Sequence, residues 1–323
     1  MPTAHPIATS RISDAPGGGA APGRAPGGAV HASRAIACLE VGRAPCDNVP
    51  LAPGEGRLAF ARVDGASALV GCTARSPLQI VVPRPRGLAS WAVLVSHGGG
   101  LVAGDRVRLD VTVGEGASAL VTTQAETKAY RAQAPGGDAL QELTVRLGAG
   151  ATLALLPDPV SCFAGARYAQ RQRFELAAGA SLLLCDAVVA GRVARGERWA
   201  FASYRSENRV LLEGALLAHD ALALADRPGR PLAARLADFD ALALVLAAGP
   251  AFAPGAAALA ARIAEASADP SAPVLASASP LPRGPGFAFR LAARSAAALD
   301  AWLRAALSFA AGPLGGDPFT RRW

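Results

Sequence analysis

A short phrase that recurs four times along the chain constrains its fold more than any other feature. Each copy has a stretch of alternating apolar and polar residues, a turn with glycine, and then Gly-Ala before a second apolar stretch. Alternation with a period of two is typical of half-buried β-strands, and glycine supplies the positive φ that such turns require. The copies begin at Leu58, Leu109, Leu143 and Phe174. The phrase therefore predicts a mostly β body over residues 55–225.

The unequal spacing of the four copies leaves two interpretations of this body. The units could stack on one another as in a β-helix, or they could form a row of unrelated hairpins. The predicted fold class is therefore mainly β, with a β-helical or stacked-hairpin body and a small C-terminal α+β layer that contains about two helices.

The two ends of the chain differ from this body. Residues 1–33 are rich in Ala, Pro and Gly, which predicts a disordered low-complexity tail, although its arginines also fit a transit peptide. The β-rich body is expected over residues 34–230. Over residues 231–323 a C-terminal α+β part should pack on the body, and Ser295 is a suitable N-cap for its last helix.

Charge and hydropathy exclude several classes of partner. The chain carries a formal net charge of +7, but its basic residues are nearly all arginines scattered singly, which favours solubility over nucleic-acid binding. The sequence has no apolar run of membrane-spanning length and no apolar region of a secretory signal. We therefore expect no nucleic-acid partner, no membrane partner and a cytoplasmic location.

Three motifs resemble known sites but lack the residues that their chemistry requires. His97 and the glycines after it resemble an esterase oxyanion loop, yet the chain has no Gly-x-Ser-x-Gly. The segment 98–103 fits a dinucleotide fingerprint, but an alternating strand follows it where a helix is needed. The histidines and cysteines do not stand at ligand spacing. These features therefore predict neither an esterase nor a dinucleotide-binding enzyme, and they predict no permanent metal cage.

Two further segments carry polar groups in unusual places. Lys128 is the chain's lone lysine and lies where a strand passes into a loop, so it belongs either to a solvated face or to a site. Asp186 interrupts an otherwise apolar strand, and a carboxylate there must be paired, hydrogen-bonded or in contact with water. Asp186 could be exposed at a sheet edge, but a polar cavity through the body explains it better.

Five motifs, in order along residues 55–323, resemble the urease accessory protein UreD family, also called UreH. They occupy residues 99–105, 122–131, 156–166, 191–197 and 208–209. The chain departs from the family pattern at His97-Gly98, Ala103-Gly104, Asp158-Pro159 and Cys185. These departures indicate a divergent member.

The resemblance implies a β-helical body, no enzymatic activity and a role in urease maturation. Family members bind the urease apoprotein and a complex of UreF with the GTPase UreG, and they help to deliver nickel through an internal polar passage. No cofactor is then bound permanently, and nickel is in transit. Such a path must release its cargo, so isolated oxygen ligands suit it better than a His/Cys cage.

The resemblance also implies roles for individual residues. Transient nickel ligands or electrostatic guides would be Asp105, Asp186 and one of His219 and Asp220, between which the motif does not choose. A second set would shape the passage or contact a partner, and a salt bridge to one of the acids is the preferred role for its lysine: Thr127, Lys128, Tyr130 and Arg131.

Two other classes of function remain open from the residues alone. A β-solenoid carbohydrate-active hydrolase or lyase would need two acids about 5 to 10 Å apart across a groove. A structural β-protein would bind a partner through its apolar edges.

Overall fold

The computed structural model describes residues 50–84, 87–132, 137–266 and 269–320. The chain divides between residues 41 and 42 into two units. The architecture below is that of the second unit. The tail expected over residues 1–33 lies outside the described residues. Within the described ranges, no helix has both the length and the apolar character that a membrane crossing requires.

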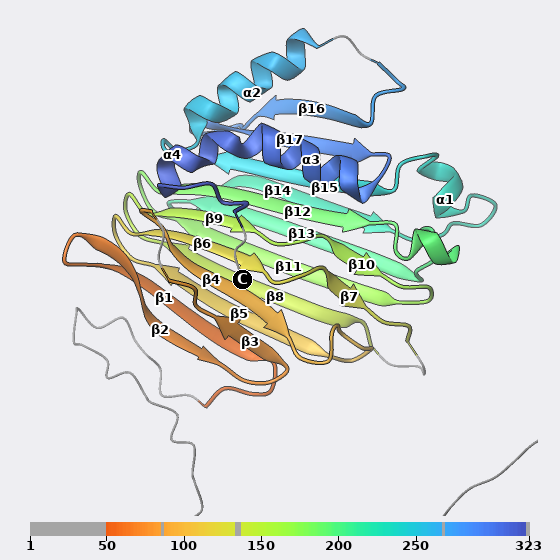
Figure 1. The fold of residues 1–323 in the computed structure, drawn as a ribbon, viewed down its shortest axis with the longest axis horizontal. Helices are drawn as coiled ribbons and strands as arrows, with labels where there is room; N and C mark the ends of the chain where they lie inside the picture. The colour runs from red at the N-terminus through yellow and green to blue at the C-terminus, as the bar shows by residue number, and fades with distance from the viewer. Residues whose placement is uncertain (1–49, 85–86, 133–136, 267–268, 321–323) are drawn as a thin grey trace, which may run out of the picture. The chain divides into compact units, whose positions relative to one another are not determined.

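Two sheets form the body of this unit (Figure 1). The seven-stranded sheet runs in the order β14 (Ala215–Leu224), β13 (Ser203–Leu212), β11 (Arg167–Leu176), β8 (Ala139–Leu147), β5 (Arg106–Val113), β1 (Glu55–Val63) and β2 (Ala66–Ala74). The ten-stranded sheet runs in the order β16 (Val274–Pro280), β17 (Gly286–Ala293), β15 (Ala241–Ala248), β12 (Ser181–Val189), β9 (Thr152–Leu156), β6 (Ser118–Thr123), β4 (Ser90–Ser96) and β3 (Leu78–Val81), with β10 (Val160–Cys162) beside β12 and β7 (Thr127–Ala129) beside β10.

Successive strands of the repeated phrase alternate between the two sheets. The strands β5, β8, β11 and β13 pair in parallel in the seven-stranded sheet, and β4, β6, β9 and β12 pair in parallel in the ten-stranded sheet. The mainly β class is thereby confirmed. The finer expectation of a β-helical or stacked-hairpin body is not confirmed, and of the four repeated units only the first is a hairpin, formed by β1 and β2. In the other three, the chain crosses to the opposite sheet after the turn.

The turns of neighbouring units are joined by backbone hydrogen bonds. The amide of Gly116 donates to the carbonyl of Ala149 at 2.9 Å, and the amide of Gly150 donates to Ala178 at 3.1 Å. Gly116 and Gly150 have φ of 60° and 62°, the left-handed region in which residues with a Cβ are strained. The sequence prediction that these glycines supply positive φ is confirmed.

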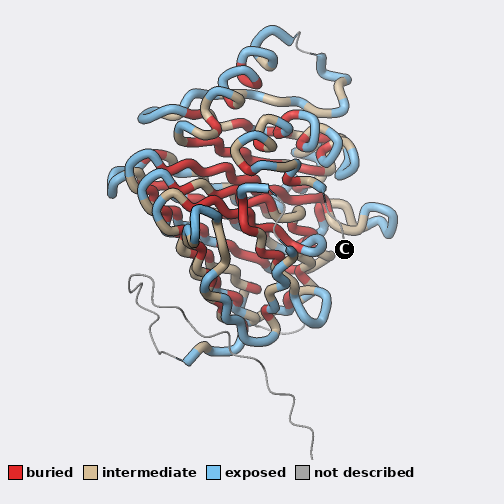
Figure 2. Tube along the Cα trace, turned by 60° about the vertical axis from the view of Figure 1, so that its left-hand side comes forward, coloured by how far each residue is buried: buried red, intermediate tan, exposed pale blue. Residues whose placement is uncertain are grey.

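Two apolar cores lie on the two faces of the ten-stranded sheet. Leu182 and Leu184 of β12 belong to the core between the sheets, whereas Leu183 belongs to the core beneath the helices. Because successive side chains of a strand point to opposite faces, a strand buried on both faces reads as a continuous apolar run. Figure 2 shows the buried residues gathered in these central strands.

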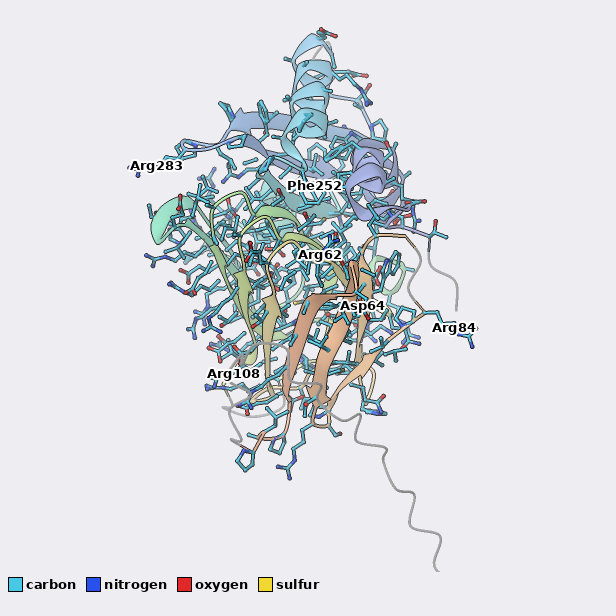
Figure 3. All side chains as sticks on the ribbon, turned by 90° about the vertical axis from the view of Figure 1, so that its left-hand side faces the viewer. Arg62, Asp64, Arg84, Arg108, Phe252 and Arg283 are labelled. Carbon is cyan, nitrogen blue, oxygen red and sulfur yellow. The ribbon has the colours of Figure 1, made fainter. Side chains whose placement is uncertain are left out.

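The C-terminal residues extend the ten-stranded sheet and cover its outer face. The strands β15, β17 and β16 add antiparallel neighbours beyond β12. Phe252, at the base of α2 (Ala253–Glu265; Figure 3), is fully buried. The Ser295 side chain accepts from the amide of Ala298 at 3.1 Å, as predicted for an N-cap. The helices are α1 (Leu232–Arg235), α2 (Ala253–Glu265), α3 (Ala296–Ala306) and α4 (Ala311–Leu314), and the 3-10 segments are η1 (Val193–Arg195) and η2 (Leu307–Ala310). The proposed domain boundary at residue 230 stays a prediction.

Candidate functional site

Asp186 is the centre of a buried polar network between the two sheets. It lies in the middle of β12 and is 8% exposed. Its carboxylate accepts hydrogen bonds from Gln170 Nε2 and Asn208 Nδ2, both at 2.7 Å, and from the Ser206 hydroxyl. All three donors come from the opposite, seven-stranded sheet. The network therefore joins the two sheets through one carboxylate in the core, as the polar-cavity interpretation of Asp186 anticipates.

The register of the seven-stranded sheet places these donors in two adjacent rows. Gln141, Gln170 and Ser206 pair directly across β8, β11 and β13. In the next row on the same face, two residues further along β11 and β13, Gln172 pairs with Asn208, and Asn208 pairs with Asp220 of β14. Because residues in register lie about 4.8 Å apart from strand to strand, the polar side chains form a continuous stripe on the inner face of this sheet.

An aromatic hydroxyl anchors one end of the stripe. The Tyr168 hydroxyl donates to Gln141 Oε1 at 2.9 Å and lies 3.1 Å from Gln170 Oε1. The ring of Tyr168 stacks on that of Tyr204 at 5.7 Å between centroids. Burial raises the pKa of Tyr168 well above its ordinary value, so the hydroxyl remains protonated. Its single proton can bond only one of these two amide oxygens at a time, and when it bonds Gln170 Oε1, it holds that amide with its nitrogen directed at Asp186.

Two cavities meet at Asp186. The inner cavity, of about 240 Å³, is bordered by Thr123, Thr127, Lys128, Gln170 and Gln172 among others. The edge cavity, of about 470 Å³, is bordered by Asp220, Leu222, Ser277 and Arg290 among others. Asp186 lines both cavities, so its carboxylate stands in the wall between them.

The electrostatics of Asp186 reflect opposing effects. Burial is the largest and raises the pKa of this carboxyl above its ordinary value, and the negative charge of Asp220 raises the pKa further. The hydrogen bonds from Ser206, Asn208 and Gln170 oppose this by stabilising the ionised form. Any cation beside Asp186 would favour the ionised carboxylate in the same way.

The structure distinguishes the neighbouring residues His219 and Asp220 by the face on which each lies. Asp220 lies on the inner face, lines the edge cavity and forms an ion pair with Arg290 of β17. His219 lies on the outer face, where its Nε2 is 3.2 Å from Glu207 and both side chains are 47% exposed. Only Asp220 of this pair is therefore within reach of the cavities.

Two of the four residues in the predicted passage set, Thr127 and Lys128, line the inner cavity. Among the described residues, no carboxylate lies within 4.0 Å of the Lys128 ammonium, so the expected salt bridge is absent there. Its positive charge acts at longer range and lowers the pKa of Glu126, against the larger raising effect of that residue's burial.

Tyr130 and Arg131 do not line the inner cavity. They belong to a packed corner beside it. The Tyr130 ring meets Phe163 edge to face at 5.2 Å, and its hydroxyl donates to the carbonyl of Gly99. A Cβ at position 100 would lie 2.6 Å from Tyr130 Cε2, so Gly100 is required for this approach. Arg131 pairs through its backbone with Ala166. This corner positions β7, which carries Thr127 and Lys128.

The motif at residues 191–197 completes the same corner. The Arg192 guanidinium lies 4.2 Å above the centre of the Phe163 ring and forms a two-pronged ion pair with Glu197. Glu197 also accepts from the amide of Ala164 at 3.1 Å. The motif residues that resemble the family therefore have two places in the fold. Residues 99–101 and 123–128 line the inner cavity, and Phe163, Arg192 and Glu197 hold the structure beside it.

Asp105 lies apart from Asp186. Its carboxylate accepts from the amide of Val102 at 2.8 Å and closes the turn before β5. In the described part of the chain, Asp105 is not among the residues that line either cavity. Its expected role as a nickel guide stays a prediction.

Sequence reasoning missed the donors around Asp186. Polar residues stand at every second position of β11 and β13, as Gln170 and Gln172 in one strand and Ser206 and Asn208 in the next. Charged residues alternate with them, so the usual rule that the polar positions face water did not separate the two faces. One signal in the sequence could have separated the two faces. Along each strand, the positions on one face carry uncharged amides or hydroxyls, and the positions on the other face carry charged side chains. Arg290 offered no local signal.

Comparisons with known proteins agree on one family. A family model described as "UreD urease accessory protein" matches residues 52–323. A protein named "Urease accessory protein UreD" from Anaeromyxobacter sp. (strain Fw109-5) is 53% identical over 290 residues, covering 88% of this chain and 96% of the relative. One of the same name from Sorangium cellulosum is 43% identical and covers 84% of each chain. "Urease accessory protein D" of Oryza sativa subsp. japonica is 37% identical, over 66% of this chain and 68% of the relative.

Proposed function

The chain belongs to the UreD family of urease accessory proteins, and we propose that it binds the urease apoprotein and a UreF/UreG complex and conducts nickel to the urease active site. The observation that carries the conduit part of this proposal is that Asp186 lines both the inner cavity and the edge cavity. A cation that moves between the two cavities would pass this carboxylate.

The donor set suits a cargo that must be released. The cavities offer carboxylate, amide and hydroxyl oxygens, and the described residues contain no cluster of three or more His, Cys, Asp or Glu that could hold a metal ion. Affinity for nickel is highest at imidazole and thiolate ligands, so oxygen donors hold the ion only weakly. Asp186 would attract the ion by charge, and Gln170, Ser206 and Asn208 would keep its carboxylate oriented while the ion passes.

At the edge cavity, a positive group of the protein itself occupies the place beside Asp220. The Arg290 guanidinium comes from β17 of the ten-stranded sheet and pairs with Asp220 of β14 in the other sheet. Its side chain is 64% exposed, whereas that of Asp220 is 16% exposed. An arriving divalent cation would therefore compete with Arg290 for this carboxylate, and the long exposed arginine side chain is free to move into solvent.

Arg290→Gln is expected to tighten the binding of Ni²⁺ to the purified chain. The substitution frees the Asp220 carboxylate, and an exposed ion pair is worth up to about 1 kcal/mol, which corresponds to about fivefold in affinity. Isothermal titration with Ni²⁺ measures the change. Arg304→Gln removes an arginine that pairs with Asp300 on the surface of α3 and should leave the affinity unchanged. Weaker binding in Arg290→Gln would contradict the competition between Arg290 and the metal.

The proposed function is tested by reconstitution. The tagged chain is co-purified with the cognate urease apoprotein, UreF and UreG, and the nickel content and ureolytic activity of the urease are measured with and without this chain. Formation of the complex together with nickel loading that depends on this chain is the expected result. A complex that fails to form, with urease activity unchanged by the chain, would overturn the proposal.

The carbohydrate-active alternative lacks a supporting observation at the edge cavity. Asp186 and Asp220 are the acids that line the edge cavity, but Asp220 is paired with Arg290 and Asp186 accepts three hydrogen bonds. Glycoside hydrolysis needs one free acid and one free carboxylate on either side of a bound sugar. The match to a family of accessory proteins favours the maturation role.

A further inference from the structure

Two buried oxygen atoms beside Asp186 have no hydrogen-bond partner among the described residues. They are Gln172 Oε1 and Asn208 Oδ1. Asn208 is 0% exposed and Gln172 is 9% exposed. A buried acceptor that is left unpaired costs about 1 to 3 kcal/mol, and buried polar groups are nearly always satisfied in native proteins. Two such acceptors in one register row indicate that something absent from the chain itself pairs with them.

The orientation of the Asn208 amide follows from its surroundings. Its nitrogen donates to Asp186 Oδ2 at 2.7 Å. Turning the amide over would set its oxygen against the carboxylate, with two acceptors facing each other. The unpaired atom is therefore an oxygen, which requires either a hydrogen-bond donor or a cation.

The register brings the unpaired oxygens together with a second carboxylate. Gln172, Asn208 and Asp220 are direct neighbours across β11, β13 and β14. Gln172 lines the inner cavity and Asp220 lines the edge cavity, so Asn208 stands in the row between them. Neighbouring strands about 4.8 Å apart allow side chains of this length to converge on one small ion.

We infer that the amide oxygens of Gln172 and Asn208, with the carboxylates of Asp186 and Asp220, form a transient oxygen-donor site for a divalent cation in the wall between the two cavities. This inference rests on the proposed function for the identity of the cargo. It adds neutral amide ligands to the carboxylates expected from the sequence.

The amides explain how one site can attract an ion and still release it. Amide oxygens coordinate hard divalent cations without adding negative charge, so they stabilise the ion less than further carboxylates would. A single site built from four carboxylates would hold a divalent cation tightly, whereas a site of two carboxylates and two amides, with Arg290 competing for one of the carboxylates, would bind it weakly. Neutral ligands therefore favour transit over storage.

Gln172→Leu tests this inference on the purified full chain, with Ni²⁺ as the probe. We expect Ni²⁺ affinity to fall roughly tenfold, in the range seen when groups that support a metal site are removed. In the metal-free protein, we expect the melting temperature to rise by about 2 °C, because an unpaired buried acceptor is removed. A lower Ni²⁺ affinity together with a higher melting temperature is the result expected if Gln172 Oε1 binds the metal.

The experiment also includes a matched control and a variant that is expected to change Ni²⁺ affinity in the opposite direction. Gln141 also lines the inner cavity, but its Oε1 already accepts from Tyr168, so Gln141→Leu should lower the melting temperature and leave Ni²⁺ affinity unchanged. Gln172→Glu places a charged oxygen at the same position and should tighten Ni²⁺ binding. This second variant tests the site even if Gln172→Leu folds poorly.

Two results would overturn the inference. Unchanged Ni²⁺ affinity in both Gln172 variants would show that the amide does not contact the metal. A fall in the melting temperature of Gln172→Leu equal to that of Gln141→Leu would show that a buried water alone pairs with the oxygen. Neither result would affect complex formation by the wild-type chain, so failure of this inference is distinguishable from failure of the proposed function.

Discussion

Asp186→Asn is expected to lower nickel-dependent urease activation by about tenfold or more while it stabilises the chain at pH 7. The substitution removes the charge that would attract a cation into the wall between the cavities, yet it preserves the size of the side chain. The hydrogen bond to Asn208 can be kept, because the Asn208 amide can turn over and accept from the introduced Nδ2 group. The expected gain in stability at pH 7 comes from the removal of a buried negative charge, which burial disfavours.

The pH dependence of stability gives a second readout for the same variant. Burial raises the pKa of Asp186 in the folded chain above its ordinary value, so the folded state holds this proton more tightly than the unfolded state does. The stability that the protonated group contributes is therefore fully present below the unfolded pKa and is lost as pH rises through the folded pKa. Asp186→Asn should remove this loss.

Urea unfolding of both proteins at a series of pH values from about 4 to 8 measures the effect. The gain in stability of Asp186→Asn over the wild type should be larger at pH 7 than at pH 4. Asp300→Asn, on the exposed surface of α3, serves as the control and should show neither the gain nor the loss of urease activation. Full urease activation by Asp186→Asn would exclude this carboxylate from the nickel path.

Gly191→Ala is expected to destabilise the chain by about 3 kcal/mol. Gly191 has a φ of +92°, and a Cβ there would lie 2.6 Å from the Cys162 carbonyl oxygen and 2.9 Å from that of Glu197. Both neighbours are backbone atoms and cannot move aside cheaply. The substitution would therefore force apart the corner in which Arg192 covers Phe163 and supports β10.

Gly196→Ala separates the two causes of this effect. Gly196 has a similar φ of +76°, but an added Cβ would meet no atom within 4 Å. Its cost should be only the strain of the left-handed backbone, about 1 kcal/mol. Urea unfolding of the two variants compares the costs directly. Equal destabilisation would show that the contact with Cys162 contributes nothing and that the corner is less closely packed than the structure indicates.

Local signals in the sequence were enough to identify the strands, the turns and the last helix. The period of two identified the strands of the repeated phrase, and the glycines of its turns have the positive φ expected of them. Ser295 caps α3 as predicted. Each of these features depends on the conformation of a few adjacent residues, which is what side-chain size and hydrogen-bonding capacity determine directly. The ordered motifs likewise identified the family.

The pairing of the strands was decided by the tertiary structure. A strand, a glycine turn and a second strand can form a hairpin in one sheet or cross between two sheets, and the local sequence is compatible with both. The first unit forms the hairpin of β1 and β2, whereas the next unit sends β5 and β6 to different sheets. The outcome depends on which distant strands compete for the same hydrogen bonds.

The candidate site shows the same division. The sequence indicated that Asp186 needs polar partners, but not that they would come from β11 and β13 of the opposite sheet. It left His219 and Asp220 as alternatives, because the family motif does not choose between them. In the structure, the pairing along β14 is irregular beside Leu217, where Val210 pairs with Ala218 and Leu211 with Leu216. Which neighbour faces the cavities is determined by strand register, and register is fixed only when the whole sheet assembles around its core.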